Sequence, residues 1–127
     1  MSSAVLDASA LLAFLRREPG AETVAAALAD CSISSVNLAE TYSRLDRSGG
    51  SLVSVARHVE RLQIPVVAFD EPQALVASSI HSRTRQYGLS LADCACLALG
   101  ISNSAVVLTA DRAWGQLSLG VEIVLIR

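Results

Sequence analysis

Short apolar segments alternate with helical segments along this chain, and that alternation constrains the fold more than any other feature. The predicted strands are Ala4–Leu6, Cys31–Ser34, Pro65–Phe69, Ala105–Thr109 and Val121–Ile126. Buried strands of four to six residues or so, separated by helices, are typical of a parallel sheet with helices on both faces. We therefore predict an α/β protein in which the carboxyl ends of the strands lie along one edge of the sheet.

The intervals between the strands have the periodicity and the end signals of helices. Apolar residues from Leu52 to Leu62 recur at the three- and four-residue spacing of an amphipathic helix, and the almost wholly apolar segment Ser90–Ser102 must be central. A short turn or helix is expected at Asp111–Trp114. The other predicted helices are Ala8–Arg17, Glu22–Ala29, a helix from Ser35 to a break at Gly49-Gly50, and one that follows Asp70-Glu71-Pro72 and ends near Gly88.

Length and composition fit one folded domain, residues 1–127. The chain is 52% hydrophobic and 17% charged, which excludes intrinsic disorder. Its apolar runs are far shorter than the roughly 18 residues of a membrane span, and Asp7 interrupts any signal-peptide core, so we expect a cytoplasmic protein with no membrane partner. The three cysteines, Cys31, Cys94 and Cys96, are interpreted as small buried hydrophobes.

The charge pattern gives no general affinity for nucleic acid. The formal net charge is −2, and all ten basic residues counted as Lys or Arg are arginines. A domain held on nucleic acid by its overall field would be strongly basic. Any contact with RNA must therefore be local, and chemistry that needs a lysine is excluded.

Four acidic residues have ordinary structural explanations when each is considered alone. Asp7 precedes a helix and can cap it, and Asp93 follows Ser90 in a Ser-x-x-Asp capping-box pattern. Asp111 can cap the turn that follows it. Glu40 has Arg44 four residues later and can form an exposed helix pair.

Considered together, these acids indicate a metal site. Asp7, Asp93 and Asp111 fall at the same predicted sheet edge, and Glu40 lies in the first turns of the helix that follows the second strand. Clustered carboxylates raise one another's pKa unless a cation compensates them. Because the lone histidines, His58 and His81, lie on helices away from this edge, hard oxygen ligands favour Mg²⁺ or Mn²⁺ over zinc.

Four segments carry these acids in a characteristic order and spacing: Val5-Leu6-Asp7-Ala8-Ser9, Ser35-Val36-Asn37-Leu38-Ala39-Glu40, Leu89-Ser90-Leu91-Ala92-Asp93 and Leu108-Thr109-Ala110-Asp111-Arg112-Ala113-Trp114. Together they resemble the PIN domain, and within it the VapC-type endoribonuclease toxins of type II toxin–antitoxin modules. The resemblance covers essentially the whole chain.

This resemblance implies a three-layer α/β/α fold with a central, mainly parallel five-stranded sheet, and an Mg²⁺- or Mn²⁺-dependent phosphodiesterase site. The implied catalytic and metal-binding acids are Asp7, Glu40, Asp93 and Asp111. Ser9 would be a hydroxyl beside the metal, Thr109 a supporting hydroxyl, and Arg112 a contact to substrate phosphate. A metal-activated water would attack an RNA phosphate in line, with Glu40 orienting the water, and the products would carry 5′-phosphates.

Other functions make different demands on the sequence. A phosphate-accepting receiver or a haloacid-dehalogenase-like phosphatase would need a lysine; a receiver also needs an acidic pair where Val5-Leu6 stands, and the phosphatase a second Asp where Ser9 stands. A catalytically silent PIN-like module that binds RNA or protein would be expected to lack one of the acids. A PIN nuclease of RNA maturation would share the same chemistry and differ only in its biological role.

The toxin resemblance also implies partners. A cognate antitoxin should wrap the chain and place a basic side chain among the carboxylates, with the helices Glu22–Ala29 and Val36–Arg47 as walls of its docking groove. A homodimer and a toxin–antitoxin hetero-oligomer are expected for the same reason. The sequence does not identify the RNA target, or the number of metal ions.

Overall fold

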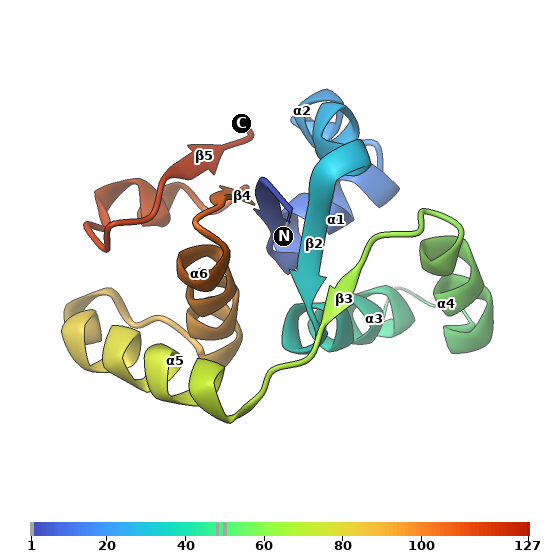
Figure 1. Ribbon diagram of the computed structural model, residues 1–127. Helices are drawn as coiled ribbons and strands as arrows, with labels where there is room; N and C mark the ends of the chain where they lie inside the picture. The colour runs from blue at the N-terminus through green and yellow to red at the C-terminus, as the bar shows by residue number, and fades with distance from the viewer. Residues whose placement is uncertain (1, 48, 50) are drawn as a thin grey trace.

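Five parallel strands form one sheet in the computed structural model, which describes residues 2–47, 49 and 51–127 (Figure 1). The strand order is β3-β2-β1-β4-β5, and every neighbouring pair is parallel. The predicted parallel sheet is therefore confirmed. The strands are β1 (Ala4–Leu6), β2 (Cys31–Ser34), β3 (Val66–Val67), β4 (Val106–Thr109) and β5 (Ile123–Leu125).

The strand order reverses between β1 and β4. From β1 the chain moves outward through β2 to β3, and it returns to the other side of β1 with β4 and β5. Ala4 pairs with Val106 and Leu6 pairs with Leu108, so β1 and β4 end at the same level. In open parallel sheets ligands bind beside the strand ends at such a reversal. The segments that follow β1 and β4 therefore meet at the place where a site is expected.

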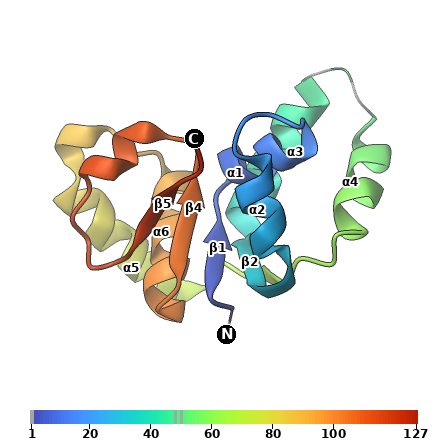
Figure 2. The same ribbon diagram turned by 90° about the horizontal axis from the view of Figure 1, so that it is seen from above.

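Helices cover both faces of the sheet, which confirms the three-layer α/β/α arrangement. Figure 2 shows α1 to α4 on one side of the sheet and α5 and α6 on the other. The helices are α1 (Ala8–Leu15), α2 (Ala21–Ala27), α3 (Ser35–Arg47), α4 (Leu52–Glu60), α5 (Glu71–Arg83) and α6 (Leu91–Asn103), with short 3₁₀ helices η1 (Leu28–Asp30), η2 (Arg85–Tyr87) and η3 (Arg112–Gln116).

Successive side chains of β1 point to opposite faces of the sheet and belong to two separate cores. Ala4 and Leu6 pack into the core under α1 to α4, whereas Val5 packs into the core under α5 and α6. Successive strand side chains point to opposite faces, so a strand covered on both sides must be apolar throughout. Helix α6 is buried from Cys94 to Gly100, as expected for a central helix.

Several elements are shorter in the structure than predicted; the last strand, for example, covers Ile123–Leu125 instead of Val121–Ile126. The expected strand Pro65–Phe69 contracts to β3, because the backbone N–H of Phe69 donates to Ser35 Oγ (3.1 Å) instead of to a neighbouring strand. The helix expected to reach Gly88 ends at Arg83. Thr84 leaves helical geometry there, and its hydroxyl donates to the Ile80 carbonyl (2.7 Å).

The first and third helices end close to their predicted ends. Helix α1 ends at Leu15, shortly before the predicted Pro19-Gly20 stop. Gly20 has a φ of +96°, which a residue with a Cβ adopts only with strain. Helix α3 ends at Arg47; of the predicted Gly49-Gly50 break, Gly50 lies outside the described residues.

The interpretation of the cysteines and histidines is confirmed. Cys31, Cys94 and Cys96 are all free and buried, and His58 and His81 are exposed on their helices. Among the described residues no helix combines the length and the apolar character that crossing a bilayer demands.

Candidate active site

Asp7 occupies the end of β1 with its carboxylate almost completely buried, at 6% exposure. Its Oδ1 accepts hydrogen bonds from the backbone N–H of Ala10 (2.8 Å) and from Ser9 Oγ (2.7 Å). Its Oδ2 accepts one from Thr109 Oγ1 (2.6 Å). The predicted helix cap is therefore confirmed, and the same carboxylate also joins α1 to the end of β4.

The two hydroxyls beside Asp7 are held by backbone groups that follow β4. Ser9 Oγ accepts from the Ala110 N–H (2.9 Å), and Thr109 Oγ1 accepts from the Asp111 N–H (3.0 Å). Because each hydroxyl already accepts a hydrogen bond from the backbone, its own proton is directed at Asp7. The structure thus brings Ser9, Thr109 and the backbone of Asp111 together around the first acid.

The pKa of Asp7 is raised from 3.8 to about 6. Burial is the largest cause, because removing the carboxylate from water disfavours its charged form. The hydrogen bonds from Thr109, Ser9 and Ala10 act in the opposite direction, and the charge of Asp93 raises the pKa further. A cation bound at this place would favour the ionised form of Asp7.

Asp93 lies at the first turn of α6 and forms a reciprocal capping box with Ser90. Its Oδ2 accepts from the Ser90 N–H (2.9 Å), and Ser90 Oγ accepts from the Asp93 N–H (3.1 Å). The predicted capping box is confirmed. The second carboxylate oxygen, Oδ1, accepts no hydrogen bond from the described part of the chain, so capping uses only half of the side chain's capacity.

Asp111 is exposed and caps η3. Its Oδ1 accepts from the Ala113 N–H (3.0 Å), as the sequence predicted. Its other oxygen receives no hydrogen bond from residues that the structure describes. Arg112 is also exposed, and its Nε donates to the carbonyl of Arg127 (3.3 Å), so its described contact is with the end of the chain.

Glu40 forms the predicted helix pair with Arg44, at 3.3 Å. The side chains are 28% and 41% exposed, respectively, so the pair lies at the surface. Glu40 also acts on the interior: the pKa of the Cys96 thiol is raised above its usual value, first by burial and then by the charges of Asp7, Asp93 and Glu40. The charges of these three acids therefore act on the same part of α6.

Electrostatic effects relate Asp7, Asp93 and Glu40, and the backbone of Asp111 bonds to Thr109 beside Asp7, but the four acids do not close into a ligand shell in the described part of the chain. Among the described residues, no three His, Cys, Asp or Glu side chains are close enough to hold a metal ion. The reason is local: Asp93 and Asp111 each turn one oxygen to a helix N-terminus, and Glu40 turns to Arg44. The donor chemistry fits a hard divalent cation, since the acids offer only oxygen and Asp93 and Asp111 each keep one oxygen uncommitted.

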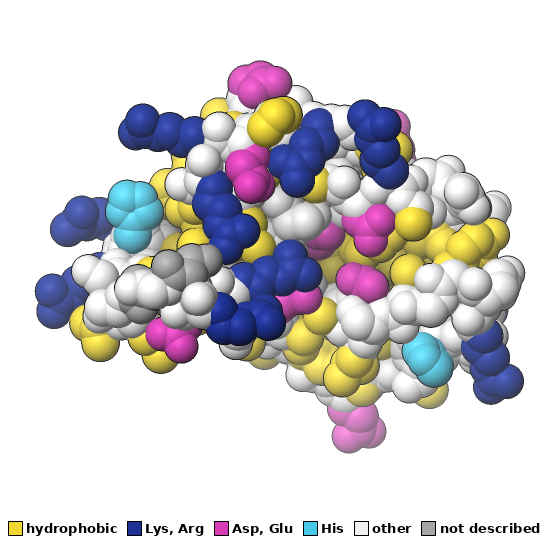
Figure 3. All heavy atoms as spheres, turned by 180° about the vertical axis from the view of Figure 1, so that it is seen from behind, with side chains coloured by type: hydrophobic (Ala, Val, Ile, Leu, Met, Phe, Trp, Pro, Cys, Tyr) yellow, Lys and Arg dark blue, Asp and Glu magenta, His cyan; other side chains and the backbone are white. Residues whose placement is uncertain are grey.

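One face of the molecule is mixed in charge. Figure 3 shows acidic side chains gathered near the middle of this face, with arginine side chains along one side of them.

The sequence analysis assigned no role to Asn37, whose side chain is buried next to this site. The residue is 1% exposed, and its Nδ2 donates to the carbonyl of Ala92 (2.9 Å), directly before Asp93. Its Oδ1 has no hydrogen-bond partner within the described residues. The sequence signal was an amide one helical turn before Glu40.

Comparison with known proteins connects this geometry to one family. The sequence model of the PIN domain matches residues 4–118. Chains in the solved toxin–antitoxin complex from Klebsiella pneumoniae and in DNA-bound VapBC from Salmonella typhimurium are similar in fold. The first has a TM-score of 0.73 at 16% identity and 98% coverage of both chains, and the second 0.73 at 18% identity and 97% coverage of both.

A third similar structure is FitAcB from Neisseria gonorrhoeae, with a TM-score of 0.70 at 22% identity and coverage of 94% of this chain and 95% of that one. At these identities the likeness establishes the fold alone. No curated protein sequence gives a significant match.

Proposed function

Because the chain belongs to the PIN-domain family, we propose that it is a divalent-metal-dependent endoribonuclease and the toxin of a VapBC-like type II toxin–antitoxin module. The observation that carries the proposal is the buried carboxylate of Asp7 at the strand reversal, with two hydroxyls directed at it and the charge of Asp93 acting on it. Such an arrangement is unfavourable for an unpaired anion, and a bound cation would relieve it.

The residues that would hold Mg²⁺ or Mn²⁺ are Asp7, Asp93 and Asp111, with Glu40 at the rim. A divalent ion there would supply charge neutralisation at the scissile phosphate and lower the pKa of a water nucleophile. Ser9 and Thr109 hold the Asp7 carboxylate in one orientation. Glu40 orients the attacking water and accepts its proton as the water oxygen bonds to phosphorus. The bond from phosphorus to the 3′ oxygen breaks, and this oxygen takes a proton from solvent, so the downstream product carries a 5′-phosphate and the upstream product a 3′-hydroxyl.

A toxin is favoured over the other PIN roles by two observations. All four acids are present, whereas a silent binding module would be expected to have lost at least one. Several similar solved structures are toxin–antitoxin or VapBC complexes, and the matched chains align with this one almost end to end. A nuclease of RNA maturation would use the same site, so the choice between these roles depends on the partner.

Metal-dependent RNA cleavage is the first expected result. Purified chain freed from any antitoxin should cut a mixed cellular RNA pool in Mg²⁺ or Mn²⁺, and EDTA should abolish the cutting. Ligation that requires a 5′-phosphate should capture the downstream fragments. Folded protein that cuts no RNA under any of these conditions would favour the silent binding module.

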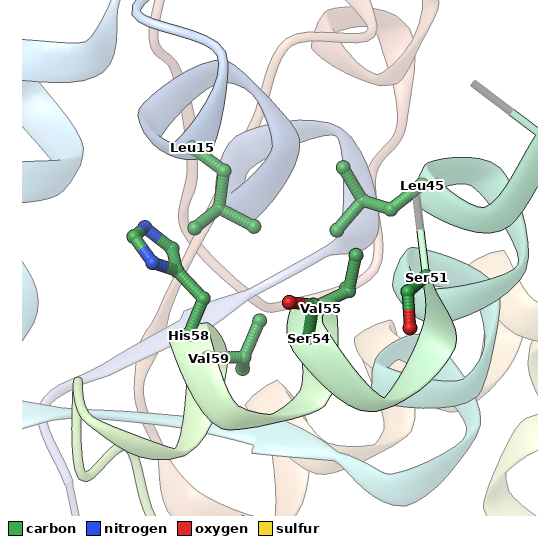
Figure 4. Close-up of a pocket in the computed structure, with 7 residues that line it drawn as sticks. All are labelled: Leu15, Leu45, Ser51, Ser54, Val55, His58 and Val59. Carbon is green, nitrogen blue, oxygen red and sulfur yellow. The ribbon is translucent and has the colours of Figure 1, made fainter. Parts of the chain in front are cut away.

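We propose that the antitoxin docks in an apolar hollow between α1, α3 and α4. Figure 4 shows Leu15 and Leu45 pointing toward each other across this hollow, with His58 beside Leu15. A second hollow shares Leu15 and His58 and continues along Ala21, Glu22 and Ala25 of α2. The walls therefore include parts of both helices that the sequence analysis proposed, and α4 is added to them. The lining residues of the first hollow are Leu15, Leu45, Ser51, Ser54, Val55, His58 and Val59.

A charge placed in this hollow should weaken antitoxin binding without affecting catalysis. Val55 lines the hollow and is partly buried, so Val55→Glu should lower the affinity for the cognate antitoxin at least about thirtyfold, because a carboxylate would be desolvated on docking. Isothermal titration measures the effect, and RNA cleavage should stay at the wild-type rate. Val53→Glu is the matched control, since Val53 lies on the same helix at 63% exposure. Equal affinities for both variants would place the antitoxin elsewhere.

A further inference from the structure

Asn37 is a polar side chain placed where packing alone would favour an apolar one. It lies between α3 and α6 at 1% exposure. Its Nδ2 donates to the Ala92 carbonyl, but its Oδ1 is buried with no hydrogen-bond partner in the described chain. An unpaired buried acceptor is unfavourable, and a leucine of similar size would avoid it. The amide therefore requires a reason other than filling space.

The hydrogen bond of Asn37 connects the two helices that carry acids of the site. Glu40 lies three residues after Asn37 and therefore on the same side of α3. Asp93 directly follows Ala92, the residue that accepts the bond. The side-chain contacts described for the two acids are local: Glu40 pairs with Arg44 and Asp93 caps its own helix. Neither of these local contacts fixes the spacing between the two acids.

A further observation relates Asn37 to the acids of the site. Cys96 lies one turn after Ala92 on α6, and the charges of Asp7, Asp93 and Glu40 all act on its thiol. These acids therefore act on the same stretch of α6 that Asn37 contacts through Ala92. Thr41 Oγ1 donates to the backbone carbonyl of Asn37 (2.8 Å), a bond that stays within α3 and does not reach α6.

We propose that Asn37 is a positioning residue that sets the spacing of Glu40 and Asp93 through its hydrogen bond between α3 and α6, and thereby the affinity of the site for divalent cations. This inference rests on the proposed nuclease function. The Asn37 amide aligns α3 and α6, a role separate from those of the four acids. Displacements of about 1 Å at a reacting centre can lower rates about a hundredfold, so loss of this bond should be measurable.

The test uses the apolar variant Asn37→Leu, which keeps the branched shape of the side chain and removes the hydrogen bond. Mn²⁺ binding, measured by electron paramagnetic resonance without RNA, should weaken at least about tenfold. Cleavage should show a kcat about ten- to a hundredfold lower with little change in the KM for RNA, because Asn37 is buried and does not touch substrate. Circular dichroism and thermal unfolding should show a folded protein, since the variant also removes the unpaired acceptor.

Thr41→Val is the matched control. Thr41 is equally buried on the same helix, and its hydroxyl bond stays within α3. This variant loses a buried hydrogen bond without separating α3 from α6, so its Mn²⁺ affinity should remain that of the wild type. Asn37→Ser provides a second probe should the leucine disturb folding: its hydroxyl is too short to reach Ala92, and the same loss of Mn²⁺ affinity is expected.

The outcomes separate this inference from the function on which it rests. Wild-type protein that binds Mn²⁺ and cuts RNA, together with folded Asn37 variants that do so equally well, would overturn the positioning role alone. A loss of Mn²⁺ affinity in Thr41→Val as large as in Asn37→Leu would also overturn it, because the effect would then be general destabilisation. Wild-type protein that binds no Mn²⁺ and cuts no RNA would overturn the nuclease proposal and this inference with it.

Discussion

Replacing Asp7 by asparagine is expected to lower RNA cleavage by at least about a thousandfold, about 4 kcal/mol in the activation free energy. Asp7 is the most buried of the four acids, and no other acid of the site is held by two hydroxyls. Asparagine has nearly the same shape and can keep the hydrogen bond from Ala10, so the loss would reflect charge and metal binding. Initial rates on a defined RNA, at saturating Mg²⁺ or Mn²⁺, measure it.

The same substitution should stabilise the metal-free protein at pH 7. The pKa of Asp7 is about 6 in the folded protein and near 3.8 in the unfolded chain. Because the pKa is higher in the folded protein, protonation of Asp7 stabilises the fold, fully so below pH 3.8. This contribution is lost as the pH rises through about 6. Ionised Asp7 therefore lowers the free energy of unfolding at pH 7, by up to about 3 kcal/mol, and Asp7→Asn should recover about 1–3 kcal/mol.

Urea denaturation in EDTA at pH 4.5 and pH 7 tests this linkage. The wild type should lose stability relative to Asp7→Asn across that interval, and saturating Mg²⁺ should stabilise only the wild type. Glu122→Gln removes one exposed carboxylate before β5, at the opposite edge of the sheet, and should change neither activity nor this pH dependence. An Asp7→Asn protein that cuts RNA at the wild-type rate would remove Asp7 from the site.

Trp114→Ala should destabilise the fold by about 3–5 kcal/mol, the largest effect expected of any substitution in the interior. The indole is 1% exposed and lies in the core that α5 and α6 share with Val5 and Val107. Truncation would leave a cavity that this close-packed core could fill only in part. The free energy of unfolding from urea titration, at an unchanged m-value, measures the effect.

Trp114→Phe separates packing from hydrogen bonding. Trp114 Nε1 has no hydrogen-bond partner among the described residues, so phenylalanine loses no such bond and should cost much less, about 1–2 kcal/mol. Leu75→Ala, at 75% exposure on α5, should change stability by less than about 0.5 kcal/mol. Equal losses for the alanine and phenylalanine variants at Trp114 would contradict a cavity mechanism.

Features that depend on neighbours in the sequence were predicted correctly. The caps at Asp7, Ser90 and Asp111 and the pair Glu40–Arg44 all involve residues within four positions of each other. The burial of whole strands could also be predicted from their continuous apolar runs, because β1 and β4 are covered on both faces and are therefore apolar throughout. Where the prediction was wrong, at the ends of β3 and α5, a side-chain hydroxyl took a backbone partner: Ser35 reaches Phe69 across 34 positions, and Thr84 bonds back to Ile80.

A parallel α/β fold with acids at the carboxyl edge of its sheet could be predicted from the sequence, because the spacing of apolar residues and the helix caps depend on residues that are neighbours in the chain. Tertiary packing set the strand order β3-β2-β1-β4-β5, which places Asp7 beside Thr109 across 102 positions. It also decided that Asp7 is buried and its pKa raised, and that Asn37 reaches Ala92. Desolvation and long-range hydrogen bonds arise only when distant segments pack together, so no local pattern encodes them.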